Sequence, residues 1–202
     1  MTQTNTEERI KQAAIEVFAK KGFSDTKTRD IAAAANVNIS TLHYYYRNKD
    51  TLFKIVADDV FRQFNAISES ILNSDISFKE KIKEFVCQYT DFCKKNPHFP
   101  SFIVFESERN PDRVYGKIDF KAMDNVIERE LNELIEKKVI RPISYPNYVL
   151  NLVSLTSFPF LNKHMLHRIN GLSEDDFNEL LETRKEMVPK MIIDYLYLKE
   201  DE

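Results

Sequence analysis

At 202 residues the chain has room for one large domain or two modest ones. Hydrophobic residues make up 43% of it and charged residues 30%, as in an ordinary soluble globular protein. The formal net charge of −3 argues weakly against a general nucleic-acid binder, but the charge is unevenly spread. Residues 1–50 hold eight Lys or Arg against six Asp or Glu, and the remainder holds 21 against 26. A mildly basic N-terminal part is compatible with DNA bound at one end of the molecule.

The chain is expected to be all-α, because glycines and prolines are few and no long stretch alternates apolar with polar residues. No apolar stretch is long enough to span a bilayer. The N-terminal segment has no basic region followed by an apolar run, so we expect no signal peptide and a cytoplasmic protein. Cys87 and Cys93 match no metal or redox spacing and are expected to be free thiols in a reducing compartment.

Apolar residues at helical spacing predict a first helix that begins near Thr4 or Thr6. Gly22 is expected to end this helix in a left-handed conformation. Thr28 is then expected to cap a second helix over residues 29–35, in which four consecutive alanines favour the helix and allow close packing.

A third helix is expected from Ile39 to about Arg47. Asn36 stands where a turn needs a left-handed residue, and Asn38 is placed to cap the helix that follows. Two short helices separated by a tight turn form the helix-turn-helix pattern.

The third helix carries an unusually polar surface, and only Leu42 and Tyr46 are left to face inward. Hydrogen-bonding side chains at its N-terminal end suit the major groove of DNA, where base edges and phosphates are in reach. A solvated helix packed on its neighbours is the alternative, since helix-turn-helix shapes also occur without DNA. The hydrogen-bonding side chains are Ser40, Thr41, His43, Tyr44 and Tyr45.

The residues that fall in the order and spacing of a known family pattern are Gly22-Phe23, Thr26, Thr28, Ile31-Ala32, Ala35, Val37, Thr41-Leu42, Tyr45-Tyr46 and Asn48-Lys49. On these residues, the region from about Thr6 to Phe64 resembles the N-terminal domain of the TetR family. Four positions depart from the family's pattern: Asn36, Asn38, Ser40 and His43. The two asparagines keep the backbone chemistry of the usual glycine and serine, whereas the other two changes lie on the surface that reads DNA.

The resemblance implies a homodimer that places the helix from Asn38 to Tyr46 in successive major grooves of a palindromic operator in double-stranded DNA. Arg29, best suited to guanine, joins Ser40, Thr41 and His43 as candidates for base-edge contacts. The candidates for phosphate contacts are Thr28, Tyr44, Tyr45 and Lys49. Asn38, at the start of the same helix, is also a candidate DNA-binding residue.

Further helices are expected from Lys49 to about Leu72, from Phe78 to about Lys95 and from Ser101 to Arg109. A long one is expected over residues 112–138, with Gly116 as its weak point. The last two are expected over residues 148–169, kinked at Pro159, and 173–198. By resemblance, residues 4–64 form the DNA-binding domain and residues 65–202 a helical ligand-sensing and dimerisation domain that pairs through its last two helices.

The resemblance also implies a mostly apolar cavity for a small-molecule effector in the body. Aromatic residues at helical spacing nonetheless occur more often in plain core. His164 and His167 lie three residues apart, but with no third ligand in view a structural role is favoured over a metal site. The candidates for lining the cavity are Phe85, Tyr89, Phe92, Phe105, Met123 and Phe158.

No nucleophile–base motif, phosphate-binding glycine loop or zinc spacing is present, so the sequence indicates neither an enzyme nor a metal or other cofactor. We therefore expect a ligand-responsive transcriptional regulator of the TetR type, acting as a repressor that its effector releases from DNA. Two alternatives stay open at this point: a dimer that activates transcription or senses no ligand, and a helical protein- or lipid-binding module without DNA affinity.

Overall fold

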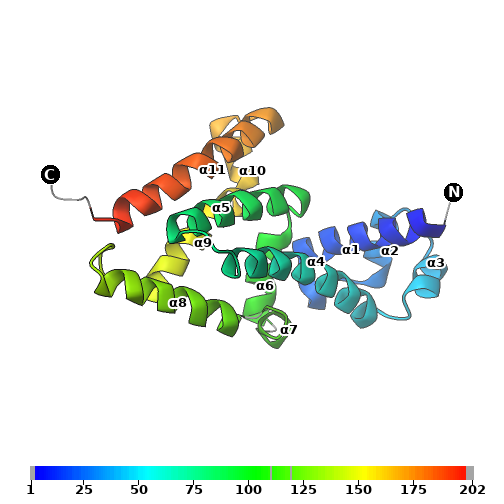
Figure 1. The fold of residues 1–202 in the computed structure, drawn as a ribbon. Helices are drawn as coiled ribbons and strands as arrows, with labels where there is room; N and C mark the ends of the chain where they lie inside the picture. Colours follow the sequence, from blue (N-terminus) through cyan, green and yellow to red (C-terminus); the bar gives the residue numbers. More distant parts are fainter. Residues whose placement is uncertain (1–2, 110, 119, 199–202) are drawn as a thin grey trace. The chain divides into compact units, whose positions relative to one another are not determined.

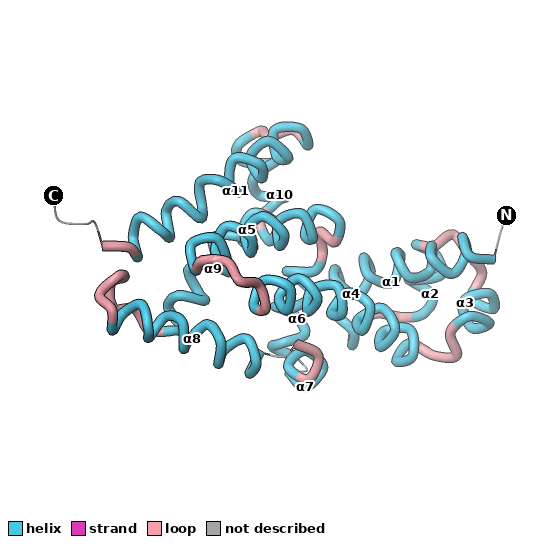
Figure 2. The backbone as a smooth tube through the Cα atoms, viewed as in Figure 1, coloured by secondary structure: helices cyan, strands magenta, loops and turns pink. Residues whose placement is uncertain are grey.

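A computed structural model describes residues 3–109, 111–118 and 120–198. The predicted all-α class is confirmed: the regular elements of these residues are helices, and the one β-type contact among them is an isolated antiparallel bridge between Ile140 and Tyr197 (Figures 1 and 2). None of the described helices is both long enough and apolar enough to cross a bilayer. The chain divides into two compact units, Met1–Gln63 with Asn96–Ile118, and Phe64–Lys95 with Asp119–Glu202.

The first unit contains α1 (Gln3–Asp25), α2 (Thr28–Ala34), α3 (Ile39–Tyr45) and the first part of α4 (Lys49–Leu72). It also contains α6 (Phe99–Arg109) and α7 (Pro111–Tyr115), so residues 96–118 group with the N-terminal part and not with the rest of the expected second domain. α1 packs against α2 and α6, and α2 against α3.

Aromatic rings fill the centre of the first unit. Phe18 lies edge-on to Phe53, with ring centroids 5.1 Å apart, and Phe53 lies 5.6 Å from Phe102 of α6. Burying an aromatic side chain of this size contributes about 1.5–3 kcal/mol to the free energy of unfolding. These contacts therefore make α6 part of the same hydrophobic core as α1 and α4.

The second unit contains the end of α4 together with α5 (Phe78–Lys95), α8 (Phe120–Glu136), α9 (Tyr145–Leu161), α10 (Lys163–Asn170) and α11 (Glu174–Leu196). α5 packs against both α9 and α11. The predicted bounds of α5 are confirmed, and so is its capping box, in which the Ser77 N–H and hydroxyl donate to Glu80. One cluster of buried core residues in this unit consists of Phe78, Ile82, Val86, Leu131, Ile140, Tyr148, Leu152, Val188, Ile192 and Leu196.

The expected single helix over residues 112–138 was wrong, because it is interrupted between α7 and α8. The interruption begins at Gly116, where the Lys117 N–H turns back to the carbonyl of Val114, 2.9 Å away. Glycine weakens a helix because it has the largest backbone entropy to lose and no side chain to pack. The residue that the sequence marked as a weak point is therefore where the helix ends.

The single helix expected over residues 148–169 was also wrong, because it is interrupted after Pro159. α9 runs through Pro159 to Leu161, and the chain breaks at Asn162 before α10. Proline has no N–H for the carbonyl four residues earlier, which belongs to Leu155. The guanidinium of Arg184 in α11 donates to that carbonyl at 2.5 Å. A side chain from another helix thus satisfies the oxygen that Pro159 leaves without its usual partner.

Candidate DNA-binding surface

The turn between α2 and α3 has the predicted backbone geometry. Asn36 has a φ of 52°, in the left-handed region that asparagine tolerates, which confirms the expectation for this residue. The N-cap of α2 was predicted wrongly: Thr28 is the first helical residue, and Lys27 occupies the cap position. The Lys27 N–H donates to the carboxylate of Asp30 at 3.1 Å, so an acidic side chain in the first turn replaces the predicted hydroxyl.

Asn38 caps α3, as predicted. Its Oδ1 accepts a hydrogen bond from the Thr41 N–H at 2.6 Å, and also from the hydroxyls of Ser40 at 2.6 Å and Thr41 at 2.8 Å. The three polar side chains at the start of α3 are therefore joined by one oxygen atom. Each hydroxyl keeps its acceptor lone pairs for a donor on a base edge, and it can donate to a base or a phosphate only by leaving Asn38.

The two faces of α3 differ sharply in burial. Leu42 has no exposed surface and Tyr46 is 2% exposed, as predicted for the inward face. Ser40, His43 and Tyr44 are exposed, and Tyr44 keeps 75% of its surface open to solvent. A tyrosine this exposed adds nothing to the core of the unit, so the outward face of α3 is free to meet another molecule.

Residues of α1 bind the segments on either side of α3. At one end, the Arg9 guanidinium donates to the carbonyls of Ala35 at 2.6 Å and Asn36 at 3.0 Å. At the other, the hydroxyl of Tyr46 donates to the carboxylate of Glu7 at 3.3 Å. Burial and the nearby negative charge of Glu7 raise the pKa of Tyr46 far above its ordinary value of 10.0, so the hydroxyl stays a donor. The orientation of α3 therefore depends on side chains that precede it by about 25 to 40 positions.

A shallow hollow beside the start of α3 brings together predicted contacts of α2 and α4, but none of the predicted contacts of α3 lines it. Thr28 and Arg29 of α2 line it with Ile39 of α3 and Lys49 of α4, and Thr26 and Lys27 complete it. Lys27 was not among the predicted contacts. Its basic side chain directly precedes Thr28 and Arg29, and this adjacency was the signal in the sequence that could have included it.

The ammonium group of Lys49 is turned toward the protein. It donates to the carbonyl of Phe23 at 2.7 Å and lies 4.3 Å from the centroid of the Phe23 ring. Asn48 caps α4 by accepting the Thr51 N–H at 2.8 Å. A phosphate contact by Lys49 remains a prediction, and it would have to use a donor that the Phe23 carbonyl does not occupy.

The acidic side chain of Asp30, which follows Arg29, is paired with neighbouring donors. The carboxylate of Asp30 lies 3.0 Å from the Lys21 ammonium and accepts the Lys27 N–H. Hydrogen bonds from these two donors hold the pKa of Asp30 below its ordinary value of 3.8. The exposed basic side chains of Lys27, Arg29 and Arg47 therefore dominate the local charge, which favours an anionic partner.

The six candidate effector contacts are only partly brought together. Phe85, Tyr89 and Phe92 lie on α5 in the second unit, where the Phe85 and Tyr89 rings stack with centroids 5.4 Å apart. Phe158 of α9 belongs to the same unit and is 55% exposed. Phe105 belongs to the first unit and is 42% exposed. The side chain of Met123 lies outside the described residues.

The hydroxyl of Tyr89 is the polar centre of this aromatic cluster. It accepts a hydrogen bond from the Ser157 hydroxyl at 2.9 Å and is itself hydrogen-bonded to the Cys93 thiol. Burial raises the pKa of Tyr89 well above its ordinary value of 10.0 and that of Cys93 to about 12. Both groups are therefore neutral, and an uncharged polar chain crosses the apolar interior of the second unit.

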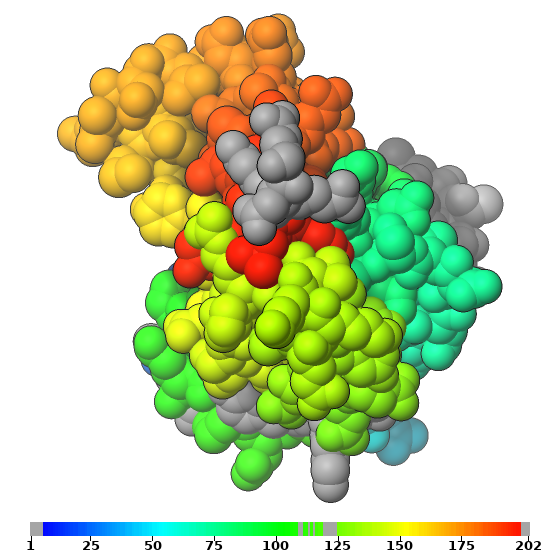
Figure 3. All heavy atoms as spheres, turned by 60° about the vertical axis from the view of Figure 1, so that its left-hand side comes forward, coloured from blue at the N-terminus to red at the C-terminus, as the bar shows by residue number. Residues whose placement is uncertain are grey.

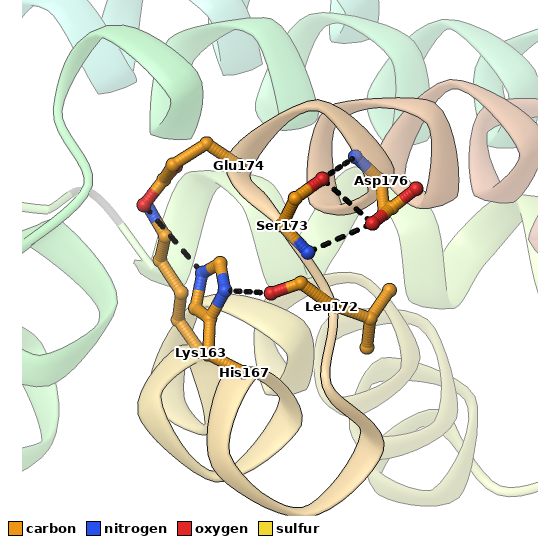
Figure 4. Close-up of polar contacts among 6 residues, drawn as sticks. All are labelled: Lys163, His167, Leu172, Ser173, Glu174 and Asp176. Atoms are coloured by element: carbon orange, nitrogen blue, oxygen red, sulfur yellow. Dashed lines mark hydrogen bonds and ion pairs between the residues drawn. The ribbon is translucent and has the colours of Figure 1, made fainter.

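His167 belongs to a junction that joins α10 to α11 (Figure 4). Its Nδ1 lies 2.5 Å from the Leu172 carbonyl, and its Nε2 lies 3.5 Å from Glu174, which also pairs with Lys163 at 2.7 Å. Ser173 caps α11 in the predicted capping box with Asp176. No group of three or more potential ligands is placed to hold a metal ion within the described part of the chain.

The comparisons with known proteins agree with this geometry. A model of the family described as "Bacterial regulatory proteins, tetR family" matches residues 10–56, which span most of α1 through the start of α4. The HTH-type transcriptional repressor NicS of Pseudomonas putida is 26% identical over 167 residues, which cover 80% of this chain and 78% of NicS.

Two solved structures share the fold. HlyIIR, a hemolysin II transcriptional regulator, has a TM-score of 0.67 at 21% identity, with 98% of this chain and all of that chain covered. The TetR family transcriptional regulator PfmR of Thermus thermophilus has a TM-score of 0.63 at 16% identity, with 90% of this chain and 97% of that chain covered. Both matches extend well beyond the helix-turn-helix and include the body of the molecule.

Proposed function

The chain belongs to the TetR family of transcriptional regulators, and from that premise we propose that it is a homodimeric repressor of a palindromic operator, released by a small, mostly apolar effector. The observation that carries this proposal is the outward face of α3. It presents Ser40, His43 and Tyr44 to solvent, while Leu42 and Tyr46 anchor its inward face. A short helix held in this way is the element that helix-turn-helix proteins insert into the major groove.

In the proposed complex, Arg29 and the first turns of α3 read base edges, and the basic residues around the hollow hold phosphates. Arg29 is exposed, and its fork of donors suits the two acceptors of guanine. Lys27 joins Thr28, Tyr44, Tyr45 and Lys49 as a phosphate contact because it lines the same hollow as Thr28, Arg29 and Lys49.

Dimerisation is proposed to use the apolar surface that α9, α10 and α11 expose in a single protomer. Ile169 is 74% exposed, Leu150 64% and Tyr195 54%, and α10 and α11 lie on the face shown in Figure 3. Exposed apolar residues in such number on neighbouring helices are typical of protein–protein contacts. A twofold pairing would set two copies of α3 about 34–36 Å apart, or at a multiple of this distance, as two reading heads on one face of DNA require.

The body, residues 65–202, is proposed to bind the effector among the aromatic residues around Tyr89. An effector that binds better to the conformation unable to hold DNA would release the operator by shifting populations. The similarity to NicS, a transcriptional repressor, favours repression over activation. We place this activity in the cytoplasm and propose no catalysis, metal or other cofactor.

Selection of genomic fragments tests the proposal. The purified full-length protein is mixed with sheared DNA of the source organism, and the fragments that it retains are sequenced and confirmed by mobility shift. We expect a shared inverted repeat that is lost with the Arg29→Ala, Tyr44→Ala double variant and kept with Lys83→Ala, an exposed lysine of α5. Retention of DNA without any common sequence would refute the operator proposal and leave the protein- or lipid-binding module as the better reading.

A further inference from the structure

The chain turns at Gly22 and Phe23, between the regular part of α1 and the start of α2. This corner is hydrogen-bonded to a residue that lies far from it in the sequence. The helix is interrupted at Gly22, whose φ of 73° lies in the region that favours glycine, and its ψ of 168° is extended and not helical. The N–H of the next residue, Phe23, donates to the carboxyl group of Glu106 at 2.9 Å. Glu106 lies on α6 and has no exposed surface.

The carbonyl and the ring of Phe23 also contact other helices of the unit. Its carbonyl accepts from the Lys49 ammonium of α4, and its ring lies edge-on to Phe53, with centroids 4.9 Å apart. The neighbouring Gly22 carbonyl accepts from the buried hydroxyl of Thr26 at 2.7 Å. One residue at the end of α1 is thus bonded to both α4 and α6 within the same unit.

This corner leads directly into the proposed DNA surface. Thr26 and Lys27 follow it, and Thr28 and Arg29 begin α2, so all four residues of the hollow's first segment lie within six positions of Phe23. Lys49 contributes to the same hollow. A change in the position of Phe23 would therefore move groups that we assign to DNA contacts.

A glutamate is a costly choice for this buried position. Burying a carboxyl group disfavours the folded state unless it is hydrogen-bonded, and an aliphatic residue would fill the same space without that cost. A backbone N–H buried without an acceptor is also costly. The hydrogen bond between Glu106 and the Phe23 N–H offsets both costs. Because a hydrogen bond is directional, it also fixes the orientation of the backbone at Phe23, which a hydrophobic contact would not.

We propose that Glu106 is a positioning residue for operator binding, which acts through the Phe23 N–H and makes the DNA-reading geometry depend on α6. The proposal rests on the proposed function. It extends that function to a residue outside positions 10–56, where the family model ends.

Operator affinity of full-length variants tests the proposal, with the fragments selected by the wild-type protein and random DNA as the two probes. For Glu106→Ala we expect about a tenfold loss of operator affinity, because only about a tenth of the molecules would hold the corner in place. Binding to random DNA, which is mainly electrostatic, should stay within about twofold. Glu106→Gln keeps an acceptor oxygen and should bind the operator within about threefold of wild type.

Glu108→Ala is the matched control, since Glu108 is an exposed glutamate on the same helix. Both alanine variants remove one potential negative charge, which by itself favours binding to DNA or leaves it unchanged. A loss of affinity confined to Glu106→Ala therefore cannot be an effect of charge. Operator binding by Glu106→Ala within about twofold of wild type, or a loss in Glu106→Gln as large as in Glu106→Ala, would overturn the proposal.

Amide hydrogen exchange in the absence of DNA gives a separate readout. Peptides containing Phe23 should exchange faster in Glu106→Ala than in wild type, with no change in Glu106→Gln or Glu108→Ala. If the wild-type protein selected no DNA, the proposed function would fail, while the exchange data would still report whether Glu106 holds the corner. If Glu106→Ala did not fold, the affinity of Glu106→Gln would test the proposal by itself. A loss of operator affinity greater than about threefold in Glu106→Gln would contradict the proposal.

Discussion

The guanidinium of Arg9 donates to the carbonyl oxygen of Ala35 at 2.6 Å, and the same nitrogen lies 3.0 Å from the carbonyl of Asn36. The two oxygens belong to the C-terminal end of α2 and to the turn that follows, where carbonyls lack partners within the helix. A positive charge is favoured there because it also meets the negative end of the helix dipole. Arg9 thus caps one helix of the helix-turn-helix and fixes the path toward the other.

Replacing Arg9 by alanine should weaken this turn. We expect the free energy of unfolding to fall by about 1.5–3 kcal/mol. A charge-assisted hydrogen bond is lost, and the part-buried carbonyl of Ala35 loses its side-chain donor. Operator affinity should fall with it, since the start of α3 becomes less well placed. Urea denaturation and a mobility shift measure the two effects. Lys20→Ala, at an exposed position of α1, is the control and should match wild type in stability and in operator affinity. Equal losses of stability and affinity in the two variants would contradict the role of Arg9.

Arg29→Ala should relax sequence preference at one position of each operator half-site. A bidentate contact with guanine contributes about 1–3 kcal/mol of discrimination, whereas a phosphate contact contributes alike to all sequences. Binding to a library of operators with single-base changes measures the preference at every position. Lys27→Ala, on the residue two positions earlier, should instead lower affinity uniformly and reduce the salt slope by about one. Uniform weakening by Arg29→Ala as well would show that Arg29 does not read a base.

The contacts of Lys49 with Phe23 allow a sharper test of its proposed phosphate contact than the sequence suggested. Lys49→Ala should weaken binding to all DNA sequences alike if the ammonium reaches a phosphate, and the salt slope should fall by about one. Because this ammonium also holds the Phe23 carbonyl, the variant is compared with Phe23→Leu, which changes the ring beneath the ammonium and keeps the carbonyl. A salt slope that is unchanged in Lys49→Ala would restrict Lys49 to the structural contact.

Acid should destabilise the folded chain through its capping carboxylates. Hydrogen bonds from Ser173 lower the pKa of Asp176 below its ordinary value of 3.8, and hydrogen bonds from Ser77 lower that of Glu80 below 4.5. Since the unfolded chain binds these protons more tightly, their contribution is fully present above about pH 5 and is lost as the pH falls below the ordinary values. Urea denaturation between about pH 3 and pH 7 measures the slope. Asp176→Asn should make the slope of the free energy of unfolding against pH shallower. A slope identical to that of wild type would contradict the contribution assigned to the Asp176 carboxylate.

Ile169→Asp should separate the protomers of the proposed dimer. Ile169 is 74% exposed in one protomer, so the change should alter the stability of the isolated chain by no more than about 0.5 kcal/mol. An aspartate buried between two protomers would instead be strongly disfavoured. Sedimentation equilibrium should show a monomer with weakened operator binding. Val139→Asp, at an exposed site outside α9–α11, serves as the control; a dimer that survives Ile169→Asp would move the interface elsewhere.

The helix-turn-helix could be predicted from the sequence because its signals are local. The left-handed conformation of Asn36, the cap at Asn38 and the inward positions of Leu42 and Tyr46 each depend on residues only a few positions away. Helical period and capping chemistry act over the same range, and this is why the bounds of α5 were also predicted correctly. Of the proposed DNA contacts, the exposure of Arg29, His43 and Tyr44 follows from the same period.

Contacts between distant residues were decided by the tertiary structure alone. Glu106 meets the Phe23 N–H across 83 positions, and the Lys49 ammonium turns to the Phe23 carbonyl across 26. Arg184 of α11 donates to the Leu155 carbonyl, which Pro159 leaves without its usual partner in α9. The sequence by itself determined the bounds of α5 and which side of α3 faces outward, since neighbouring residues set both. Which polar side chains hold those helices in place depends on packing between segments that only the folded chain brings together.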